Sequence, residues 1–391
     1  FNVTVGWRWF WFGETYDGLL ARGDAKFQPD FSKASDPAAI IFTTGSTGPA
    51  KGVLYSHGNF WNQVDEIRDF YQIGPGEIDL PGFPLFALFN CAMGVTTVIP
   101  DMDFTRPAQV DPKKILEAAS DWKVTQAFGS PALWNAVGRY CEERGLTIPS
   151  LKRVLSAGAP VPPHVLARMK AAIHADGDIH TPYGATESLP VASISASEVL
   201  GETAAKTAIG GGTCVGRRFP GIEWRVIEIS DGPLPAISDC REMPRGEIGE
   251  IIVRGPVVTR EYVTQIEANA LHKIQDGDTL WHRIGDVGYL DEQNRFWFCG
   301  RKGHRVRTAR GEMYTEPCEA IFNSHPRVYR SALVGVGPIG KQRPVIVVEC
   351  WPEKKPADAE DEERLVAELH ELAKKYSHTA IIADILLHRS L

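Results

Sequence analysis

AAIIFTTGSTGPAKGV, residues 38–53, is the most informative stretch of the chain. It opens with an apolar run that predicts a buried strand, and it continues through glycine and hydroxyl residues to Lys51. Glycines let backbone N–H groups turn toward an anion, hydroxyls add donors, and a lysine adds positive charge. We therefore expect a polyphosphate-binding loop directly after a strand, with a solvated surface loop as the alternative. The Walker phosphate loop is excluded, because counting from Gly45 puts Ala50 and Gly52 where that motif needs glycine and a hydroxyl residue.

Strands and helices alternate along the chain after this stretch. Ser56 is typical of a helix N-cap and predicts a helix to about Gln72. Further helices are expected at 111–123, 131–145 and 162–173, with strands at 124–128 and 153–158 between them. The helix at 131–145 has Pro131 in its first turn and Gly145 after its end, which is the usual asymmetry of helix termini. Strands alternating with helices of about a dozen residues predict a parallel sheet with helices on its faces.

The expected pattern of secondary structure changes twice more along the chain. After about Glu187 it becomes a series of short β-runs with glycine and proline, such as WRVIEI, GEIGEIIVRG and RFWFCG. After Arg301 a helix (EPCEAIFNSH), the strands SALVGVG and RPVIVVECW and a charged helix follow. We predict an α/β fold: a large domain of parallel sheets flanked by helices (1–190) with a β-rich subdomain (191–300), then a small mobile α+β C-terminal domain (301–391). We expect residues of the protein to be missing at both ends of this sequence.

Composition narrows the class of protein. The 391 residues are 43% hydrophobic and 23% charged, which excludes a disordered or fibrous chain. A net charge of −7 argues against a nucleic-acid partner. Seven scattered cysteines without a C-x-x-C pair fit reduced thiols in the cytoplasm. The longest uncharged run, Leu80 to Pro100, contains several prolines, so we expect a buried strand and loop there and no transmembrane segment.

A family resemblance emerges from five segments taken in order. TTGSTGPAKGV resembles the phosphate loop of the adenylate-forming superfamily, which contains acyl-CoA synthetases, peptide-synthetase adenylation domains and luciferases. Four later segments resemble further motifs of that superfamily: SAGAP (156–160), YGATES (183–188), GEIGEIIVRG (246–255) and GDVGYLD (285–291) followed by GRK (300–302). The resemblance covers Phe42 to about Glu319 and implies an ATP-dependent, AMP-forming ligase.

The resemblance also implies a role for each matching residue. Lys51, Thr186 and Glu187 are the implied catalytic residues, and Glu187 is the implied ligand of Mg²⁺, a cation that prefers carboxylate oxygen. ATP or AMP would be bound by the phosphate loop (Thr43, Thr44, Gly45, Ser46, Thr47, Gly48 and Lys51), the adenine-pocket wall (Ala157, Gly158 and Ala159), Tyr183 with Gly184 against the adenine, Thr186 at the α-phosphate, and Asp286 and Arg301 at the ribose.

Departures from the common pattern point to one branch. Ala87 stands where acyl-CoA synthetases carry a histidine or aromatic gate, and Gly303 replaces their charged hinge residue. With PLFALFN, WHRIGDVGYLD and FCGRKGHRV, the chain resembles the β-lactone synthetases of bacterial long-chain olefin biosynthesis. That branch activates a long-chain 2-alkyl-3-hydroxy acid, whose own β-hydroxyl then closes the ring.

Other readings of the function stay open. A long-chain fatty acid–CoA ligase is the main alternative, and a non-catalytic nucleotide-binding sensor is a remote one. The implied partners are a long-chain fatty or β-hydroxy acid and other enzymes of olefin biosynthesis. The lysine that completes family sites near the C-terminus is expected beyond Leu391.

Overall fold

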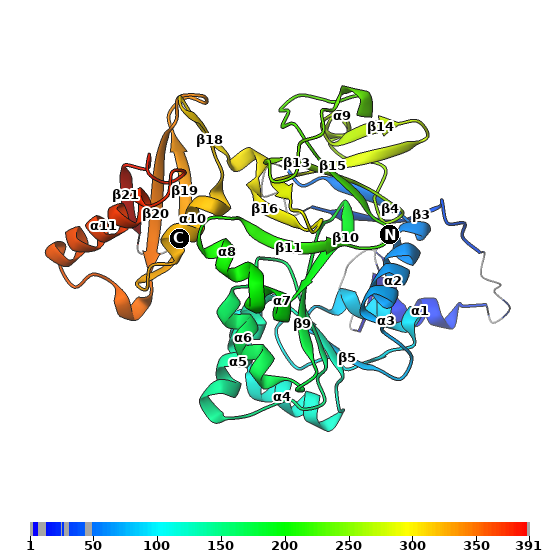
Figure 1. Ribbon diagram of the computed structural model, residues 1–391. Coiled ribbons are helices and arrows are strands. Elements are labelled where there is room, and N and C mark those ends of the chain that lie inside the picture. The colour runs from blue at the N-terminus through cyan, green and yellow to red at the C-terminus, as the bar shows by residue number, and fades with distance from the viewer. Residues whose placement is uncertain (1–2, 7–12, 25, 27–30, 44–48, 389–391) are drawn as a thin grey trace.

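The computed structural model describes residues 3–6, 13–24, 26, 31–43 and 49–388 (Figure 1). A 12-stranded sheet forms its centre, and a smaller three-stranded sheet lies toward the C-terminus. The first part of the large sheet is parallel and runs in the order β6 (Thr96–Thr97), β5 (Ile78–Pro81), β7 (Gln126–Gly129), β8 (Arg153–Ser156) and β9 (Asp178–Ala185).

Helices cover both faces of this parallel part. The helices α4 (Pro112–Asp121), α5 (Pro131–Arg144) and α6 (Pro163–Ala172) share one core with the strands, in which Leu133, Trp134 and Val154 are at most 1% exposed. The helices α2 (His57–Tyr71) and α3 (Ala87–Met93) belong to a second core and lie on the other side of β9 (Figure 1). The predicted parallel sheet with flanking helices is therefore confirmed.

The rest of the large sheet is antiparallel. Beyond β9 it continues through β10 (Ser188–Ser195), β11 (Thr213–Arg218), β16 (Phe296–Arg301), β15 (Thr279–Leu290), β13 (Gly249–Arg254) and β12 (Glu223–Ile227), while β14 (Lys273–Asp276) pairs with β15. This confirms the β-rich texture after Glu187. The sheet passes without a break through 190/191, where we drew a domain boundary, and our domain division stays a prediction.

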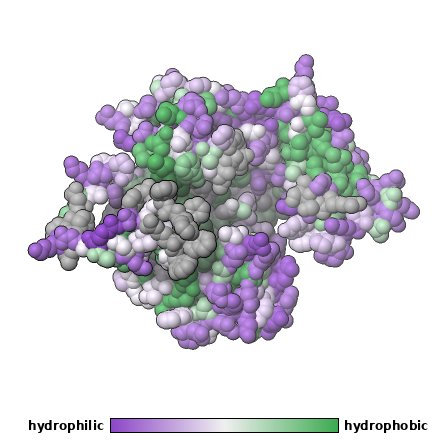
Figure 2. Space-filling model, turned by 180° about the vertical axis from the view of Figure 1, so that it is seen from behind, coloured by the Kyte–Doolittle hydropathy of each residue, from purple (hydrophilic) through white to green (hydrophobic). Residues whose placement is uncertain are grey.

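The C-terminal part is built on the three-stranded sheet β19 (Val328–Val336), β20 (Arg343–Cys350) and β21 (Asp384–His388). The helices α10 (Thr315–Asn323) and α11 (Ala359–Lys374) pack on it around buried residues such as Phe322, Ile346 and Leu369. Val334, Val336 and Leu386 of the sheet stay exposed, and a hydrophobic area is visible over this part of the molecule (Figure 2). The α+β class expected after Arg301 is confirmed.

Local end signals account for most helices. In α2 the Ser56 hydroxyl accepts from the Asn59 N–H, and Gln72 ends the helix with φ of 54°. In α5 Ser130 is the N-cap, and Gly145 ends the helix with φ of 62°. The predictions for these two helices are confirmed to within a residue.

One expectation was wrong and one was incomplete. The strand β3 (Pro37–Phe42) forms as predicted but is not buried, because it pairs only with β4 (Gly52–Ser56) in a two-stranded hairpin among the described residues. Phe42 is 58% exposed as a result. The run from Leu80 to Pro100 contains the helix α3 as well as strand and loop. Its apolar spacing permits a short helix, which Gly94 ends with φ of 72°.

The remaining elements are short. They are β1 (Val3–Thr4), β2 (Glu14–Thr15), α1 (Tyr16–Ala21), α7 (Ala196–Glu198), α8 (Ala204–Ala208), α9 (Ala268–His272), β17 (Val306–Thr308) and β18 (Gly311–Met313). Within the described ranges no helix is long and apolar enough to cross a membrane.

Candidate active site

The phosphate-loop region begins where the β3–β4 hairpin opens. The Thr43 N–H donates to the Lys51 carbonyl at 3.0 Å, and the Lys51 N–H donates to Thr43 Oγ1 at 3.0 Å. These two bonds fix both ends of the loop. The predicted loop residues Thr44, Gly45, Ser46, Thr47 and Gly48 lie outside the described residues.

The side chain of Lys51 lies over an aromatic ring. Its Nζ is 5.6 Å from the ring centroid of Tyr262, a residue that is 1% exposed. The backbone around Tyr262 is joined to the hairpin, since the Val263 N–H donates to the Gly52 carbonyl at 2.9 Å and the Gly52 N–H donates to Thr264 Oγ1 at 2.7 Å. The predicted loop lysine is thereby brought to a segment more than 200 residues away in sequence.

The turn between β9 and β10 carries the next predicted residues. The Thr186 carbonyl accepts from the Tyr55 hydroxyl at 2.5 Å, and Glu187 Oε1 accepts from the Tyr262 hydroxyl at 2.5 Å. Glu187 is 9% exposed. Gly184 is needed here, because a Cβ at that position would lie 2.7 Å from the Ser188 carbonyl oxygen. Lys51 and Glu187 thus contact the same tyrosine, Lys51 at its ring and Glu187 at its hydroxyl.

A second group of predicted residues forms where β15 and β16 pair. Asp286 and Arg301 are directly opposite in this ladder, and Arg301 Nη1 lies 2.7 Å from Asp286 Oδ1. The Tyr183 hydroxyl donates to Asp286 Oδ2 at 2.5 Å. Asp286 is 3% exposed, and burial raises its pKa to about 6 against the opposing effect of Arg301. Burial and the Asp286 carboxylate also raise the pKa of Tyr183, so its hydroxyl stays a donor.

The predicted adenine-pocket wall follows the end of β8. Ala157, Gly158 and Ala159 leave the sheet there, and Gly158 has φ of +96°, a conformation that favours glycine. The Ser156 hydroxyl, just before them, is buried and has no hydrogen-bond partner among the described residues. The Ser188 hydroxyl, just after Glu187, is in the same condition. Two unpartnered buried hydroxyls beside the predicted residues fit a site that a polar ligand completes.

Several site residues were missed by the sequence analysis. Tyr55 and Tyr262 hold Thr186 and Glu187, and Lys273 Nζ donates to the Thr259 carbonyl at 2.5 Å behind them. Burial lowers the pKa of Lys273 to about 7, with Glu187 acting in the opposite direction. None of these residues belongs to a local motif. Tyr55 lies on β4, the bridge from Val53 brings Tyr262 to that strand, and the pairing of β14 with β15 places Lys273.

The residues fit a metal bound together with phosphate. Among the described residues no group of three or more histidine, cysteine or carboxylate side chains could hold a metal alone. Mg²⁺ is usually bound by one or two carboxylates plus the phosphates of a substrate. Glu187 beside the ends of the predicted phosphate loop supplies one such carboxylate.

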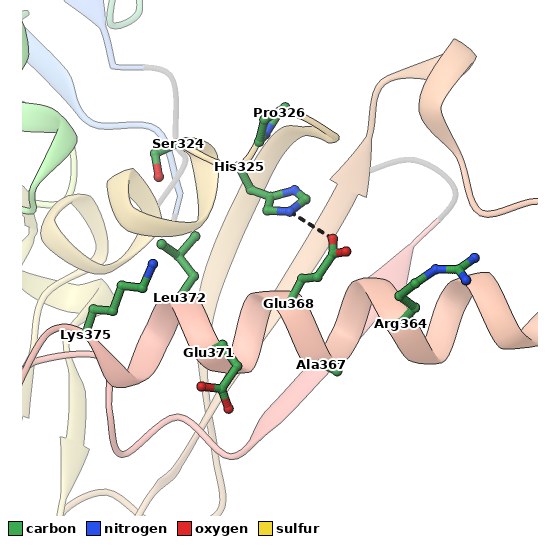
Figure 3. Close-up of a pocket in the computed structure, with 9 residues that line it drawn as sticks. All are labelled: Ser324, His325, Pro326, Arg364, Ala367, Glu368, Glu371, Leu372 and Lys375. Atoms are coloured by element: carbon green, nitrogen blue, oxygen red, sulfur yellow. Dashed lines mark ion pairs between the residues drawn. The ribbon is translucent and has the colours of Figure 1, made fainter.

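A separate hollow lies far from these residues. It has a volume of about 490 Å³ and is lined by residues of α11 and of the turn after α10 (Figure 3). Two of its lining residues contact each other, with His325 Nε2 3.2 Å from Glu368 Oε2. No residue of the predicted site lines this hollow.

Comparisons with known proteins identify the family of the chain. The profile of the AMP-binding enzyme family matches residues 11–263, and the chain belongs to that family. The chain is 47% identical over 393 residues to the olefin β-lactone synthetase of Xanthomonas campestris pv. campestris, a match that covers 99% of this chain and 69% of that protein. It is 49% identical over 354 residues to the olefin β-lactone synthetase of Stenotrophomonas maltophilia, covering 89% of this chain and 63% of that protein. The chain therefore spans about two thirds of the length of these relatives.

Solved structures share the fold. ATP-bound MatB from Rhodopseudomonas palustris aligns with a TM-score of 0.74 at 22% identity, covering 96% of this chain and 70% of that one. O-succinylbenzoate coenzyme A synthetase from Bacillus subtilis, in complex with ATP and a magnesium ion, aligns with a TM-score of 0.75 at 20% identity, covering 97% and 72%. The predicted fold class and family resemblance are confirmed.

Proposed function

We propose that this chain belongs to an ATP-dependent, adenylate-forming β-lactone synthetase that acts on a long-chain 2-alkyl-3-hydroxy acid. The observation that carries the proposal is the joining of Lys51 and Glu187 through Tyr262, next to a Tyr183–Asp286–Arg301 group. Lys51 and Glu187 suit the phosphates of ATP. The Tyr183–Asp286–Arg301 group suits its ribose. Identities of 47% and 49% to two olefin β-lactone synthetases support the choice of branch.

The first step of the proposed reaction joins two anions. A carboxylate oxygen of the acid attacks the α-phosphorus of ATP, and the bond from that phosphorus to the oxygen bridging the α- and β-phosphates breaks. Pyrophosphate departs, and acyl-AMP is the product. Catalysis of such a step rests on positioning and charge neutralisation. Lys51 would neutralise phosphate charge, Thr186 would donate to the α-phosphate, and Asp286 would hold the ribose hydroxyls. Mg²⁺ bound at Glu187 would supply further neutralisation of the phosphates.

The second step closes a ring within the activated acid. The β-hydroxyl oxygen attacks the acyl carbonyl carbon, the bond to AMP breaks, and a β-lactone and AMP leave after the hydroxyl proton is lost. Because nucleophile and electrophile share one molecule, the step gains from a high effective concentration. No second substrate is needed.

Two residues favour this second step over transfer to coenzyme A. Ala87, the first residue of α3, presents only a methyl group at the position of the usual gate. Gly303 has open space around the direction of a Cβ, so packing does not explain the lack of a charged side chain there. A chain that makes no thioester has no need of either group. Other enzymes of olefin biosynthesis are the proposed partners, and the cytoplasm is the proposed compartment.

The test compares acids with and without coenzyme A. Full-length protein, ATP and Mg²⁺ are incubated with a long-chain 2-alkyl-3-hydroxy acid or with palmitate, and products are identified by mass spectrometry. We expect AMP and a β-lactone from the hydroxy acid at a rate independent of coenzyme A. Palmitoyl-CoA formed from palmitate at a matching rate would replace the proposal with an acyl-CoA ligase. Absence of pyrophosphate release with every acid would favour the nucleotide sensor.

A further inference from the structure

The segment from Thr259 to Tyr262 grips Glu187 at two places. The Thr259 N–H and hydroxyl both donate to the Glu187 backbone carbonyl, at 2.9 and 3.0 Å. The Tyr262 hydroxyl donates to the Glu187 carboxylate at 2.5 Å. One short segment therefore fixes both the backbone and the side chain of this glutamate.

A second layer of contacts holds that segment. Asn269 bonds both ends of the Tyr262 peptide unit, since its Oδ1 accepts from the Tyr262 N–H at 2.8 Å and its Nδ2 donates to the Tyr262 carbonyl at 3.0 Å. Lys273 Nζ donates to the Thr259 carbonyl at 2.5 Å and lies 5.7 Å from the Tyr262 ring centroid. Thr259 and Tyr262 are at most 1% exposed, and Lys273 is 7% exposed. The contacts to Glu187 are thus anchored by further buried and part-buried polar contacts.

The Tyr262 hydroxyl bonds one carboxylate oxygen and leaves the other available. The Tyr262 hydroxyl donates to Oε1 and so fixes the position of that oxygen. Glu187 Oε2 has no hydrogen-bond partner among the described residues. A glutamate has several rotatable bonds, and bonding one oxygen restricts where the other can point.

We propose that Tyr262 is a positioning residue for the metal-binding carboxylate of Glu187, that Thr259 fixes the Glu187 backbone for it, and that Asn269 and Lys273 hold this segment in place. This inference rests on the proposed function, because it takes Glu187 as the ligand of Mg²⁺. A partner that orients a metal ligand in this way typically contributes 10–100-fold to metal affinity. A merely structural role would instead lower stability and leave metal affinity unchanged.

The experiment measures metal binding directly. Full-length protein with ATP is titrated with Mn²⁺, a paramagnetic probe for the Mg²⁺ site, and free Mn²⁺ is followed by its electron paramagnetic resonance signal. In Tyr262→Phe, which keeps the ring and removes the hydroxyl, we expect about tenfold weaker Mn²⁺ binding. AMP binding without metal should stay within twofold of the wild type. Lys273→Met should weaken Mn²⁺ binding in the same direction.

Tyr289→Phe is the matched control. It also removes a tyrosine hydroxyl, which donates to the Gly211 carbonyl at 2.7 Å, far from Glu187 in the sheet. We expect wild-type Mn²⁺ affinity in this variant. If Tyr262→Phe does not fold, Thr259→Val removes the hydroxyl on the Glu187 carbonyl and tests the same grip.

Glu187→Gln separates this inference from the proposed function. Loss of Mn²⁺ binding in Glu187→Gln together with wild-type affinity in Tyr262→Phe, or in Thr259→Val where that variant is used, would overturn the positioning role alone. Unchanged Mn²⁺ binding in Glu187→Gln would overturn the metal assignment itself and the inference with it.

Discussion

We predict that nucleotide binding depends on pH through the buried carboxyl of Asp286. Its pKa is raised to about 6 by burial, yet the proposed ribose contact needs the ionised, accepting form. With a pKa near 6, only about a tenth of the protein is ionised at pH 5, against nearly all of it at pH 7.5. The affinity for a ribose-containing ligand should therefore rise about tenfold between these pH values.

Adenosine is the ligand to use for this measurement. The phosphate of AMP has a second pKa near 6 and would add its own titration, whereas adenosine carries the ribose without it. Affinity is measured by isothermal titration calorimetry from pH 5 to pH 7.5. In Asp286→Asn, which keeps the size of the side chain, we expect weaker binding with no dependence on pH.

Asp79→Asn is the control for this prediction. Asp79 is 5% exposed, its pKa is also raised to about 6 by burial, and it pairs with Asn90 at 2.7 Å on β5, away from the site. The pH dependence should persist in this variant. A flat profile in the wild type, or a profile that Asp286→Asn leaves unchanged, would refute the ribose assignment of Asp286.

Three further predictions concern stability and site geometry. Glu250→Gln leaves the buried Arg283 without its anion, so we expect a loss of about 3–5 kcal/mol in the free energy of unfolding, measured with urea. Gly184→Ala forces a Cβ against the Ser188 carbonyl oxygen, so adenosine and Mn²⁺ binding should both fall in a variant whose circular dichroism matches the wild type. The pKa of Lys273 is lowered to about 7, so between pH 7 and pH 10 the unfolded chain binds the extra proton. The unfolding free energy relative to Lys273→Met should then rise with pH by about 1.4 kcal/mol per unit, and a constant difference would contradict the assignment.

Local signals in the sequence were enough for the helices and for the class of the sheet. The capped helix α2 follows from Ser56, and α5 follows from Pro131 and Gly145, because the residues that satisfy helix ends are neighbours in the chain. The exposed strand β3 was predicted as buried because its sequence is apolar. Burial depends on what packs against a strand, and the sequence of the strand itself does not encode that.

Some residues of the candidate site could be predicted from the sequence, and others could not. Asp286 and Arg301 were predictable as binding residues only through a resemblance, and their contact follows from the register of β15 against β16. Tyr262 and Lys273 carry no motif at all. Tyr262 reaches the site through a bridge to Val53, which joins segments distant in sequence, and Lys273 is placed by the pairing of β14 with β15. Residues that act by supporting another side chain leave no local pattern to detect.

The turn between β9 and β10 joins the two ends of the proposed nucleotide site. Tyr183 contacts Asp286 at the proposed ribose end, and Glu187, four positions later in the sequence, contacts Tyr262 at the proposed phosphate end. Four residues span at most about 14 Å, so the turn limits how far apart the backbones of Tyr183 and Glu187 can lie. Tyr55 pins the middle of the turn through the Thr186 carbonyl. A nucleotide bound at both ends would therefore have little freedom to move between them. Restricting it in this way would orient the α-phosphorus for attack without any covalent bond to a side chain.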